Sequence, residues 1–365
     1  MKRDRTLIIA NSVYQLLTAV HMKRTMLREN KADLLITDIT PKLKEYVPHL
    51  KETGLFQRVL FGRTMELNRV YATENEKQLS EVFSQIQRRM LWILDEELGE
   101  YMYIYFANYD IFLRMLACLF YDSECEFICY EDGFSTYIID YLRKDRAAIN
   151  RHPEGGKIRN KVKKVLLYEP RLAMRGDGLT NLSLPKIRPD DQQTKEVLNH
   201  VFDYHRPKEH AEFLFLEQSF REEGIQTNDI ELMRECQTCV GTGRFFVKPH
   251  PRNRENVPFT LGLTRKYTCD VPWELFLLNE YSRERFTVLT VCSNAALTSR
   301  IVFGMDLNTV MLYPLFHGKI LWKEDEILLQ YLKRFRIQFA GKNYYVPQTI
   351  YELRRILGYL GGHNG

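Results

Sequence analysis

Two short segments carry the residue types that a group transfer needs. One is Glu131-Asp132-Gly133, and the other is Lys248-Pro249-His250-Pro251. Each follows an apolar run that predicts a buried strand, and ligands bind where strands end at the edge of an α/β sheet. A carboxylate can deprotonate an attacking hydroxyl, and a cationic histidine can stabilise an anionic leaving group. The two segments together predict transfer of a group from an anionic donor.

The acidic segment offers two candidate catalytic carboxylates, Glu131 and Asp132. Adjacent acids repel each other, which tends to raise one of the two pKa values toward a range that is useful for a base. Gly133 lets another backbone or a ligand approach closely. An acidic turn without a catalytic role is the alternative interpretation.

The second segment places a histidine between two prolines. The prolines restrict the backbone around His250 and so direct its imidazole. We expect a protonated His250 to bind a phosphate and to give up a proton as that phosphate leaves. An ordinary loop histidine is the alternative.

Two further segments are typical of nucleotide binding. Ser293 and Asn294 follow an apolar run and open a helix, whose free N–H groups and dipole favour phosphate. Glu274 lies one turn into a helix that Pro272 begins, where a carboxylate can accept hydrogen bonds from ribose hydroxyls. A routine helix cap and a first-turn acid are the respective alternatives.

The elements that position these residues alternate along the chain. The expected strands cover residues 6–10, 32–37, 59–61, 101–106, 126–130, 212–216, 244–248, 286–291 and 310–312. The expected helices cover residues 13–28, 41–52, 74–97, 110–120, 191–203, 227–236, 272–279 and 347–360, and another opens at 292–295. Strands that alternate with helices predict βαβ units and parallel sheets. The predicted fold class is α/β, with two Rossmann-like domains, because 365 residues exceed one typical core.

Composition narrows the class of protein. Hydrophobic residues make up 45% and charged residues 27%, as in a soluble globular protein. A net charge of +5 is too small for a nucleic-acid signature but suits anionic ligands. No apolar run reaches the length of a membrane helix, and no signal peptide is evident, so we expect a cytoplasmic protein. The seven cysteines are scattered, with Cys236 and Cys239 forming a single CxxC, so we predict free thiols and no metal site.

Residues 143–175 are strongly basic. Eleven lysines and arginines lie there, among them Lys161, Lys163 and Lys164, around Gly155-Gly156. One interpretation is a solvated connector that contains a basic helix. The other is a surface that meets an anionic lipid or an anionic glycan acceptor, as a peripheral protein at the inner face of the cell membrane would have.

Taken together, these motifs resemble those of bacterial sialyltransferases with a GT-B fold, the lipooligosaccharide sialyltransferase and polysialyltransferase type. Residues 131–133, 248–251 and 293–294 match that family's motifs in order. Residues 7–17 are similar to its first strand and helix, and residues 214–218 to the strand and glutamine that open its second domain. One departure concerns the phosphate loop. The family has two adjacent hydroxyl residues there, whereas this chain has Ser293 followed by Asn294, with Thr298 and Ser299 one turn further on.

The resemblance implies an inverting, metal-independent transfer of sialic acid from CMP-sialic acid to a hydroxyl of a surface glycan, such as a capsule or lipooligosaccharide. It implies no cofactor, because the CMP-sugar is a donor substrate, and it implies two domains that face each other across a cleft. The implied roles are catalytic for Asp132, His250 and Glu131, donor-binding for Lys248, Pro249, Glu274, Ser293, Asn294 and Gln218, and acceptor-side for Ser12, Gln15 and Gly133. The domains are expected at 1–185, with a basic connector at 143–175, and at 186–346, followed by a terminal helix and tail at 347–365.

Other functions stay open at this point. A transferase with a CMP-Kdo or CDP-alditol donor would use similar cytidine and phosphate contacts. A non-catalytic glycan-assembly protein of the same fold is a second alternative, although the intact Asp132 and His250 argue against it. A nucleophile-elbow hydrolase is excluded, because Gly-x-Ser-x-Gly does not occur. The expected partners are a nucleotide-sugar donor and a glycan acceptor but no nucleic acid; homodimerisation, acceptor identity and linkage are left open.

Overall fold

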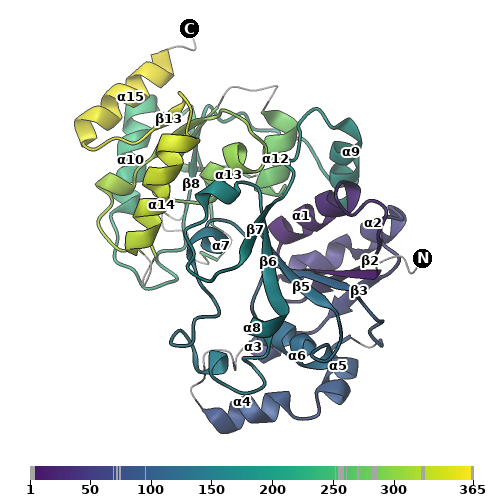
Figure 1. Cartoon of the computed structure of the whole chain (residues 1–365). Helices are drawn as coiled ribbons and strands as arrows, with labels where there is room; N and C mark the ends of the chain where they lie inside the picture. Colours follow the sequence, from purple (N-terminus) through teal and green to yellow (C-terminus); the bar gives the residue numbers. More distant parts are fainter. Residues whose placement is uncertain are drawn as a thin grey trace. The chain divides into compact units, whose positions relative to one another are not determined.

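The chain forms two compact units (Figure 1). The computed structural model describes residues 5–362 except 69, 71, 72, 74, 95, 251, 254–258, 260, 269, 270, 282–285 and 322–324. The first unit comprises Met1–Ile187 and Asp191–Asp203, and the second comprises Arg188–Asp190 and Tyr204–Gly365. Each unit has its own parallel sheet with helices around it.

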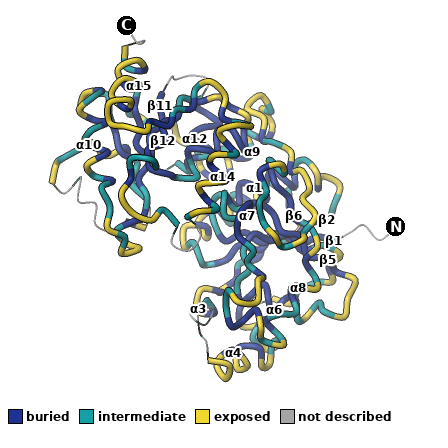
Figure 2. Tube along the Cα trace, turned by 60° about the vertical axis from the view of Figure 1, so that its left-hand side comes forward, coloured by how far each residue is buried: buried dark blue, intermediate teal, exposed yellow. Residues whose placement is uncertain are grey.

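The first unit contains a seven-stranded sheet in the order β3-β2-β1-β4-β5-β6-β7. Its strands are β1 (Arg5–Ala10), β2 (Lys31–Thr37), β3 (Val59–Gly62), β4 (Tyr103–Phe106), β5 (Glu126–Tyr130), β6 (Val162–Leu167) and β7 (Thr180–Ser183). Its helices are α1 (Val13–Arg24), η1 (Pro41–Tyr46), α2 (Val47–Glu52), α3 (Met65–Asn68), α4 (Glu76–Phe83), α5 (Ile86–Leu94), α6 (Ile111–Leu119), α7 (Ser135–Ile138), η2 (Ala148–Asn150), α8 (Ile158–Lys161), η3 (Pro170–Leu172) and α9 (Gln192–Val201). Strands β1 and β2 are buried along almost their whole length, apart from their first residues (Figure 2).

The second unit contains a six-stranded sheet in the order β10-β9-β8-β11-β12-β13. Its strands are β8 (Phe213–Leu216), β9 (Phe245–Lys248), β10 (Arg265–Lys266), β11 (Thr287–Thr290), β12 (Asn308–Met311) and β13 (Tyr344–Tyr345). Its helices are α10 (Asp229–Val240), α12 (Trp273–Glu280), α13 (Ala295–Ile301), η4 (Tyr313–Leu315), α14 (Asp325–Gln338) and α15 (Ile350–Gly362). The four residues of β8 are all buried, as the run Phe-Leu-Phe-Leu predicts.

Both sheets have the doubly wound topology. In each, the first strand lies inside the sheet, and the strand order reverses on either side of it. The reversal falls between β1 and β4 in the first unit and between β8 and β11 in the second. Ligands bind outside the carboxyl ends of the strands at such a switch point. The fold thus predicts ligand contacts near the loops that follow β1, β4, β8 and β11.

The basic stretch is not a connector between domains. Its centre is β6, which pairs in parallel with both β5 and β7, and Val162, Val165, Leu166 and Leu167 are buried. The expectation of a solvated connector with a basic helix at 143–175 is therefore wrong.

Two helical expectations also need correction. The helix expected at 74–97 is divided into α4 and α5, and Gln85 between them has a φ of 53°. Helix α9, which we assigned to the second domain, belongs to the first unit. The Arg24 guanidinium donates to Thr194 Oγ1 at 3.2 Å, and His49 Nδ1 lies 3.2 Å from the Val201 carbonyl oxygen.

Candidate active site

Asp132 lies at the carboxyl end of β5, in a chain of amide contacts at the first switch point. Asn108 Nδ2 donates to Asp132 Oδ2 at 3.3 Å. Asn108 Oδ1 in turn accepts hydrogen bonds from Gln15 Nε2 at 2.6 Å and from Asn11 Nδ2 at 3.1 Å. Asn11 follows β1 and Asn108 follows β4, so the strand order brings these residues together.

The environment of Asp132 suits a general base. Burial raises the pKa of its carboxyl, while hydrogen bonds from Gln15 and Asn108 stabilise the carboxylate and oppose that rise. The Asp132 N–H donates to Thr136 Oγ1 at 2.8 Å, which fixes the backbone at this position. A buried carboxylate whose pKa is raised accepts a proton more readily than an ordinary one.

Glu131 is turned into the protein. Its side chain is 1% exposed, and its carboxylate accepts hydrogen bonds from the Tyr14 hydroxyl at 3.1 Å, from the Tyr168 N–H at 2.8 Å and from the Tyr137 hydroxyl. Burial raises the pKa of Glu131 to about 7 against the effect of these donors. Hydrogen bonds to the Glu131 carboxylate thus connect the end of β5, directly before Asp132, with α1, with α7 and with the end of β6.

The other acceptor-side candidates have local roles. The Ser12 hydroxyl caps α1 by accepting from the Gln15 N–H at 3.2 Å. Gly133 has a φ of 75°, in the left-handed region that favours glycine. Of the three, Gln15 alone is joined to Asp132 through the amide contacts described above.

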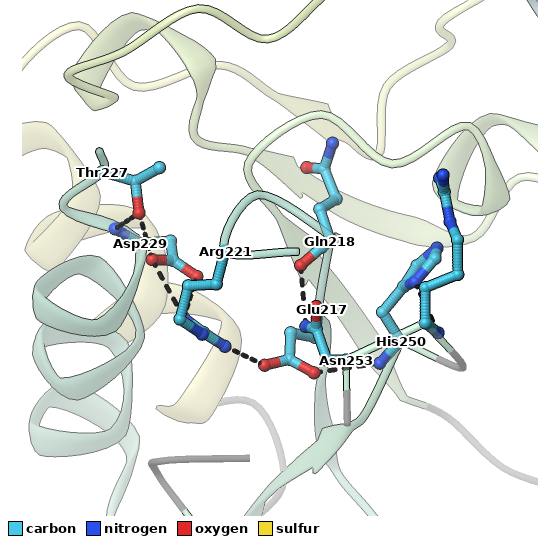
Figure 3. A network of polar contacts seen from close by, with 8 residues as sticks. Glu217, Gln218, Arg221, Thr227, Asp229, His250 and Asn253 are labelled. Atoms are coloured by element: carbon cyan, nitrogen blue, oxygen red, sulfur yellow. Dashed lines mark hydrogen bonds and ion pairs between the residues drawn. The ribbon is translucent and has the colours of Figure 1, made fainter. Parts of the chain in front are cut away.

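The second site lies at the carboxyl ends of β8 and β9, and Figure 3 shows its polar contacts. The His250 N–H donates to Glu217 Oε2 at 2.9 Å. His250 then closes a turn, because its carbonyl oxygen accepts from the Asn253 N–H at 3.0 Å. Asn253 Nδ2 donates to the Gln218 carbonyl oxygen at 3.0 Å, so two neighbouring residues after β8 hold both ends of the turn. Pro251 falls outside the described residues.

The imidazole of His250 is neutral at neutral pH. Burial and the neighbouring positive charge of Arg252 lower its pKa to about 4. The Arg252 N–H donates to His250 Nδ1 at 3.2 Å, so the proton of the neutral ring is carried by Nε2. The expectation of a cationic histidine is therefore corrected to a neutral one, which can still donate one hydrogen bond to a phosphate oxygen.

Lys248 and Glu274 influence each other. Burial raises the pKa of Glu274, in the first turn of α12, and the positive charge of Lys248 opposes that rise. Lys248 ends β9, where its carbonyl oxygen accepts from the Glu217 N–H at 3.1 Å. Pro249 continues from there to His250 and is half-buried. The charge of Lys248, two residues before His250, therefore acts on Glu274, the candidate ribose-binding carboxylate.

The loop after β11 is built from short-range contacts. Gln218 Oε1 accepts from the Cys292 N–H at 2.6 Å, so the side chain of Gln218 holds the start of this loop. Ser293 Oγ accepts from the Ala295 N–H at 3.3 Å, and Asn294 is the N-cap of α13.

The hydroxyl residues one turn further along do not replace the second hydroxyl of the family's phosphate loop. Thr298 and Ser299 are buried, and their hydroxyls donate to the carbonyl oxygens of Asn294 and Ala296, at 3.3 Å and 3.5 Å. Ser293 is therefore the hydroxyl residue that this loop offers next to its N–H groups.

Among the residues of these networks that were not predicted, Asn11, Asn108 and Glu217 share one signal. Asn11 and Asn108 follow strands directly or within two residues, a signal that was present in the sequence. Glu217 follows β8 in the same way. A search for polar side chains immediately after each apolar run would have identified all three.

The described residues form neither a metal-binding cluster nor a membrane-spanning helix. Within the described ranges, no three His, Cys, Asp or Glu side chains are grouped as a metal site. Across the same ranges, no helix combines the length and apolar character needed to cross a membrane. The six described cysteines, which include Cys236 and Cys239, are free thiols, and Cys269 lies outside the described residues.

Two doubly wound units, each with polar residues after the strands around its switch point, define a GT-B-like fold. The glycotransferase of kitacinnamycin has a TM-score of 0.53 to this chain at 10% identity, over 99% of this chain and 91% of that one. UGT89C1 of Arabidopsis thaliana, complexed with UDP, has a TM-score of 0.52 at 11% identity, over 99% and 90% of the two chains. These likenesses support the fold.

The family is shown by sequence. The model of the alpha-2,8-polysialyltransferase family matches residues 6–311, and the chain belongs to that family. An α-2,3-sialyltransferase from Photobacterium phosphoreum has a TM-score of 0.49 at 12% identity, over 96% of this chain and 100% of that one, and the assignment does not depend on it. No curated protein sequence matches the chain.

Proposed function

We propose that this glycosyltransferase moves sialic acid from CMP-sialic acid to a hydroxyl of a glycan, with inversion at the anomeric carbon. The observation that carries the proposal is the half-buried Asp132 carboxylate after β5, held by Asn108 and Gln15 from the loops at the switch point, in a member of this family. Such a group can act as a base in a sugar-transfer reaction, where an acceptor hydroxyl must lose its proton.

Each bond change in this reaction has a residue assigned to it. Asp132 takes the acceptor proton as the acceptor oxygen attacks the anomeric carbon of the sialic acid. The bond from that carbon to the phosphate oxygen breaks, and CMP leaves with the electron pair. His250 Nε2–H donates to a phosphate oxygen and stabilises the charge that develops there. The N–H groups that follow Ser293 give further donors, and Glu274 is assigned to the ribose hydroxyls.

A panel of donors tests the proposal. The purified chain is incubated with CMP-sialic acid, CMP-Kdo and CDP-ribitol, each with a sialylated oligosaccharide acceptor, and the release of CMP and the elongated product are measured. We expect product from CMP-sialic acid alone. Product from one of the other donors would replace sialic acid in the proposal, and the absence of product and of CMP binding with all of them would favour a non-catalytic role.

We predict that transfer survives removal of divalent cations. The leaving group carries a single phosphate, and the proposal assigns its charge to His250 and to backbone N–H groups. Initial rates should be nearly the same with and without excess EDTA. A rate that is lost in EDTA and restored by Mg²⁺ or Mn²⁺ would show that a cation takes part.

We also propose that the basic region of the first unit contacts an anionic membrane surface. Of the three lysines considered above, Lys161 donates to the Ser123 carbonyl oxygen at 2.7 Å, and Lys164 pairs with Glu126 at 2.7 Å. Lys163 is exposed and lines a cavity of about 340 Å³ together with Arg143, Lys144 and Arg159. Lys144 and Lys163 are therefore the lysines that an anionic surface would meet.

The prediction is that Lys144→Ser/Lys163→Ser weakens binding to vesicles that contain anionic lipid. Each lysine near such a surface contributes about 1 kcal/mol, so binding should fall by roughly 30-fold at low salt. Lys164→Ser is the matched control, because that lysine is already paired with Glu126. Turnover on a small soluble acceptor should not change, and equal vesicle binding by the double variant and the control would contradict the proposal.

A further inference from the structure

A carboxylate–guanidinium chain, formed by Glu217 and Arg221, contacts the backbone N–H of His250 (Figure 3). Glu217 Oε2 accepts from the His250 N–H at 2.9 Å, and its other carboxylate oxygen pairs with Arg221. We infer that Glu217 and Arg221 are positioning residues for His250, an inference that rests on the proposed function of that histidine. Glu217 lies within residues 214–218, which the sequence analysis singled out, but neither Glu217 nor Arg221 was assigned a role there.

Glu217 is placed for this task by the sheet. It is the first residue after β8, the strand at the switch point, and its side chain is 5% exposed. Its own N–H donates to the Lys248 carbonyl oxygen at 3.1 Å, which continues the pairing of β8 with β9 by one residue. The backbone N–H of Glu217 therefore contacts Lys248 and its side chain contacts His250, so Glu217 hydrogen-bonds the residues on both sides of Pro249. A carboxylate that accepts a backbone N–H makes a charge-assisted bond, which is stronger than a neutral one.

Arg221 connects Glu217 to helix α10 of the same unit. Its Nη1 lies 3.0 Å and 3.3 Å from the two carboxylate oxygens of Asp229, at the start of α10. Asp229 is buried and also accepts from the Thr227 hydroxyl. The guanidinium thus bridges two buried carboxylates with its two terminal nitrogens, and Glu217 cannot rotate away without breaking an ion pair. Arginine suits this role because its fork holds two acceptors in a fixed geometry.

The position of the backbone decides the position of the imidazole. The turn is closed by the His250 carbonyl oxygen and the Asn253 N–H at 3.0 Å, and the ring is oriented by the Arg252 N–H on Nδ1 at 3.2 Å. Both bonds are internal to the turn, so they fix the ring relative to the turn. Glu217 and the Gln218 carbonyl oxygen fix the turn relative to the sheet. A displacement of a reacting group by about 1 Å can cost on the order of 100-fold in rate.

The chain offers a matched control at the other end of the same strand. Glu212 precedes β8 and pairs with Arg244, whose Nε and Nη2 lie 2.9 Å and 2.6 Å from Glu212 Oε2. Both glutamates are partners of an arginine beside β8, but only Glu217 reaches the histidine turn among the described contacts. Glu212→Gln therefore removes a glutamate–arginine ion pair beside the same strand, at a more exposed glutamate, without affecting His250.

The experiment compares Glu217→Gln with Glu212→Gln, using CMP release from CMP-sialic acid and thermal unfolding. Glutamine keeps one acceptor oxygen but brings an amide N–H₂ to face either His250 N–H or Arg221. We expect Glu217→Gln to lower kcat/KM by roughly 10- to 100-fold, the worth of a hydrogen bond to a charged group. Glu212→Gln should have nearly the parent kcat/KM, whatever its melting temperature. Arg221→Lys keeps the charge but not the fork, and should lie between the parent and Glu217→Gln.

A double-mutant cycle separates positioning from general stability. In a His250→Ala background, Glu217→Gln should change kcat/KM very little, because the ring that it positions is gone. Equal effects of Glu217→Gln with and without His250 would overturn the inference, and so would equal kcat/KM losses in Glu217→Gln and Glu212→Gln. If Glu217→Gln does not fold, Arg221→Lys is taken through the same cycle with the same criterion. A parent rate in His250→Ala itself would instead reject the proposed role of the histidine, which is a distinguishable outcome.

Discussion

Asp132→Asn should lower kcat by roughly 10²–10⁴-fold, the usual contribution of a general base. The asparagine side chain has nearly the same shape and can still accept from Asn108, but it cannot take up a proton. Donor affinity should change little, because the proposed donor contacts come from other residues. The measurement is turnover on a sialylated oligosaccharide, together with calorimetric titration of CMP.

The pH dependence of kcat/KM gives an independent check on the same residue. A base works when it is deprotonated, so activity is present above the pKa of Asp132 in the folded protein and is lost as pH falls through it. Burial raises that pKa above its ordinary value of 3.8, so the acid limb should lie above pH 3.8. Asn108→Ala removes a hydrogen bond that stabilises the carboxylate, and should move the limb to higher pH.

Two outcomes would contradict this assignment. Near-parent turnover in Asp132→Asn would transfer the role to Glu131 or remove it from this segment. An acid limb that does not move in Asn108→Ala would belong to another group. Asp122→Asn, at an exposed position before β5, is the control for a loss of carboxylate charge in the same unit, and should keep the parent rate.

The buried strands could be predicted from the sequence because their apolar runs are visible locally. Strand β8 is the simplest example, with four buried residues and no polar one. Strand β6 was missed because Lys163 and Lys164 interrupt its apolar run, and only its second half is continuously buried. Strand β7 lies at the edge of the sheet with all four residues exposed, so it has no apolar pattern to find. Helix α14, by contrast, was not predicted, although the spacing of Leu328, Tyr331, Leu332 and Phe335 on one buried face is typical of a helix.

The candidate residues could be predicted from sequence motifs, but the contacts between them could not. The identity of Asp132 and His250 as candidates follows from their place after apolar runs. The hydrogen bond from Asn108 to Asp132 requires β4 to lie next to β5. The hydrogen bond from the His250 N–H to Glu217 requires β8 to lie next to β9. Strand order is set by long-range packing, so no local pattern contains it. The neutral state of His250 is a further consequence of burial, which two flanking prolines do not indicate.

His250→Ala should weaken donor binding and also slow transfer, since one imidazole is proposed to hold the phosphate in both the ground state and the transition state. Loss of one donor to developing charge costs about 3 kcal/mol, or roughly 150-fold in kcat/KM. The pKa of about 4 adds a sharper expectation: His250 stays neutral between pH 5 and pH 8, so its contribution should not change over that range. Steady-state kinetics of the parent and of His250→Ala across this interval measure the difference.

A conservative variant tests whether a neutral donor is sufficient. The amide N–H₂ of glutamine can donate from about the place of Nε2 but cannot become a cation at these pH values. His250→Gln should therefore retain clearly more activity than His250→Ala, with the larger recovery in KM for the donor. If the two variants were equally impaired, and if the parent's advantage over both grew as pH fell toward 5, the imidazolium would be the working species. The reaction would then need the bound phosphate to raise the pKa of His250 against the burial and the Arg252 charge that lower it.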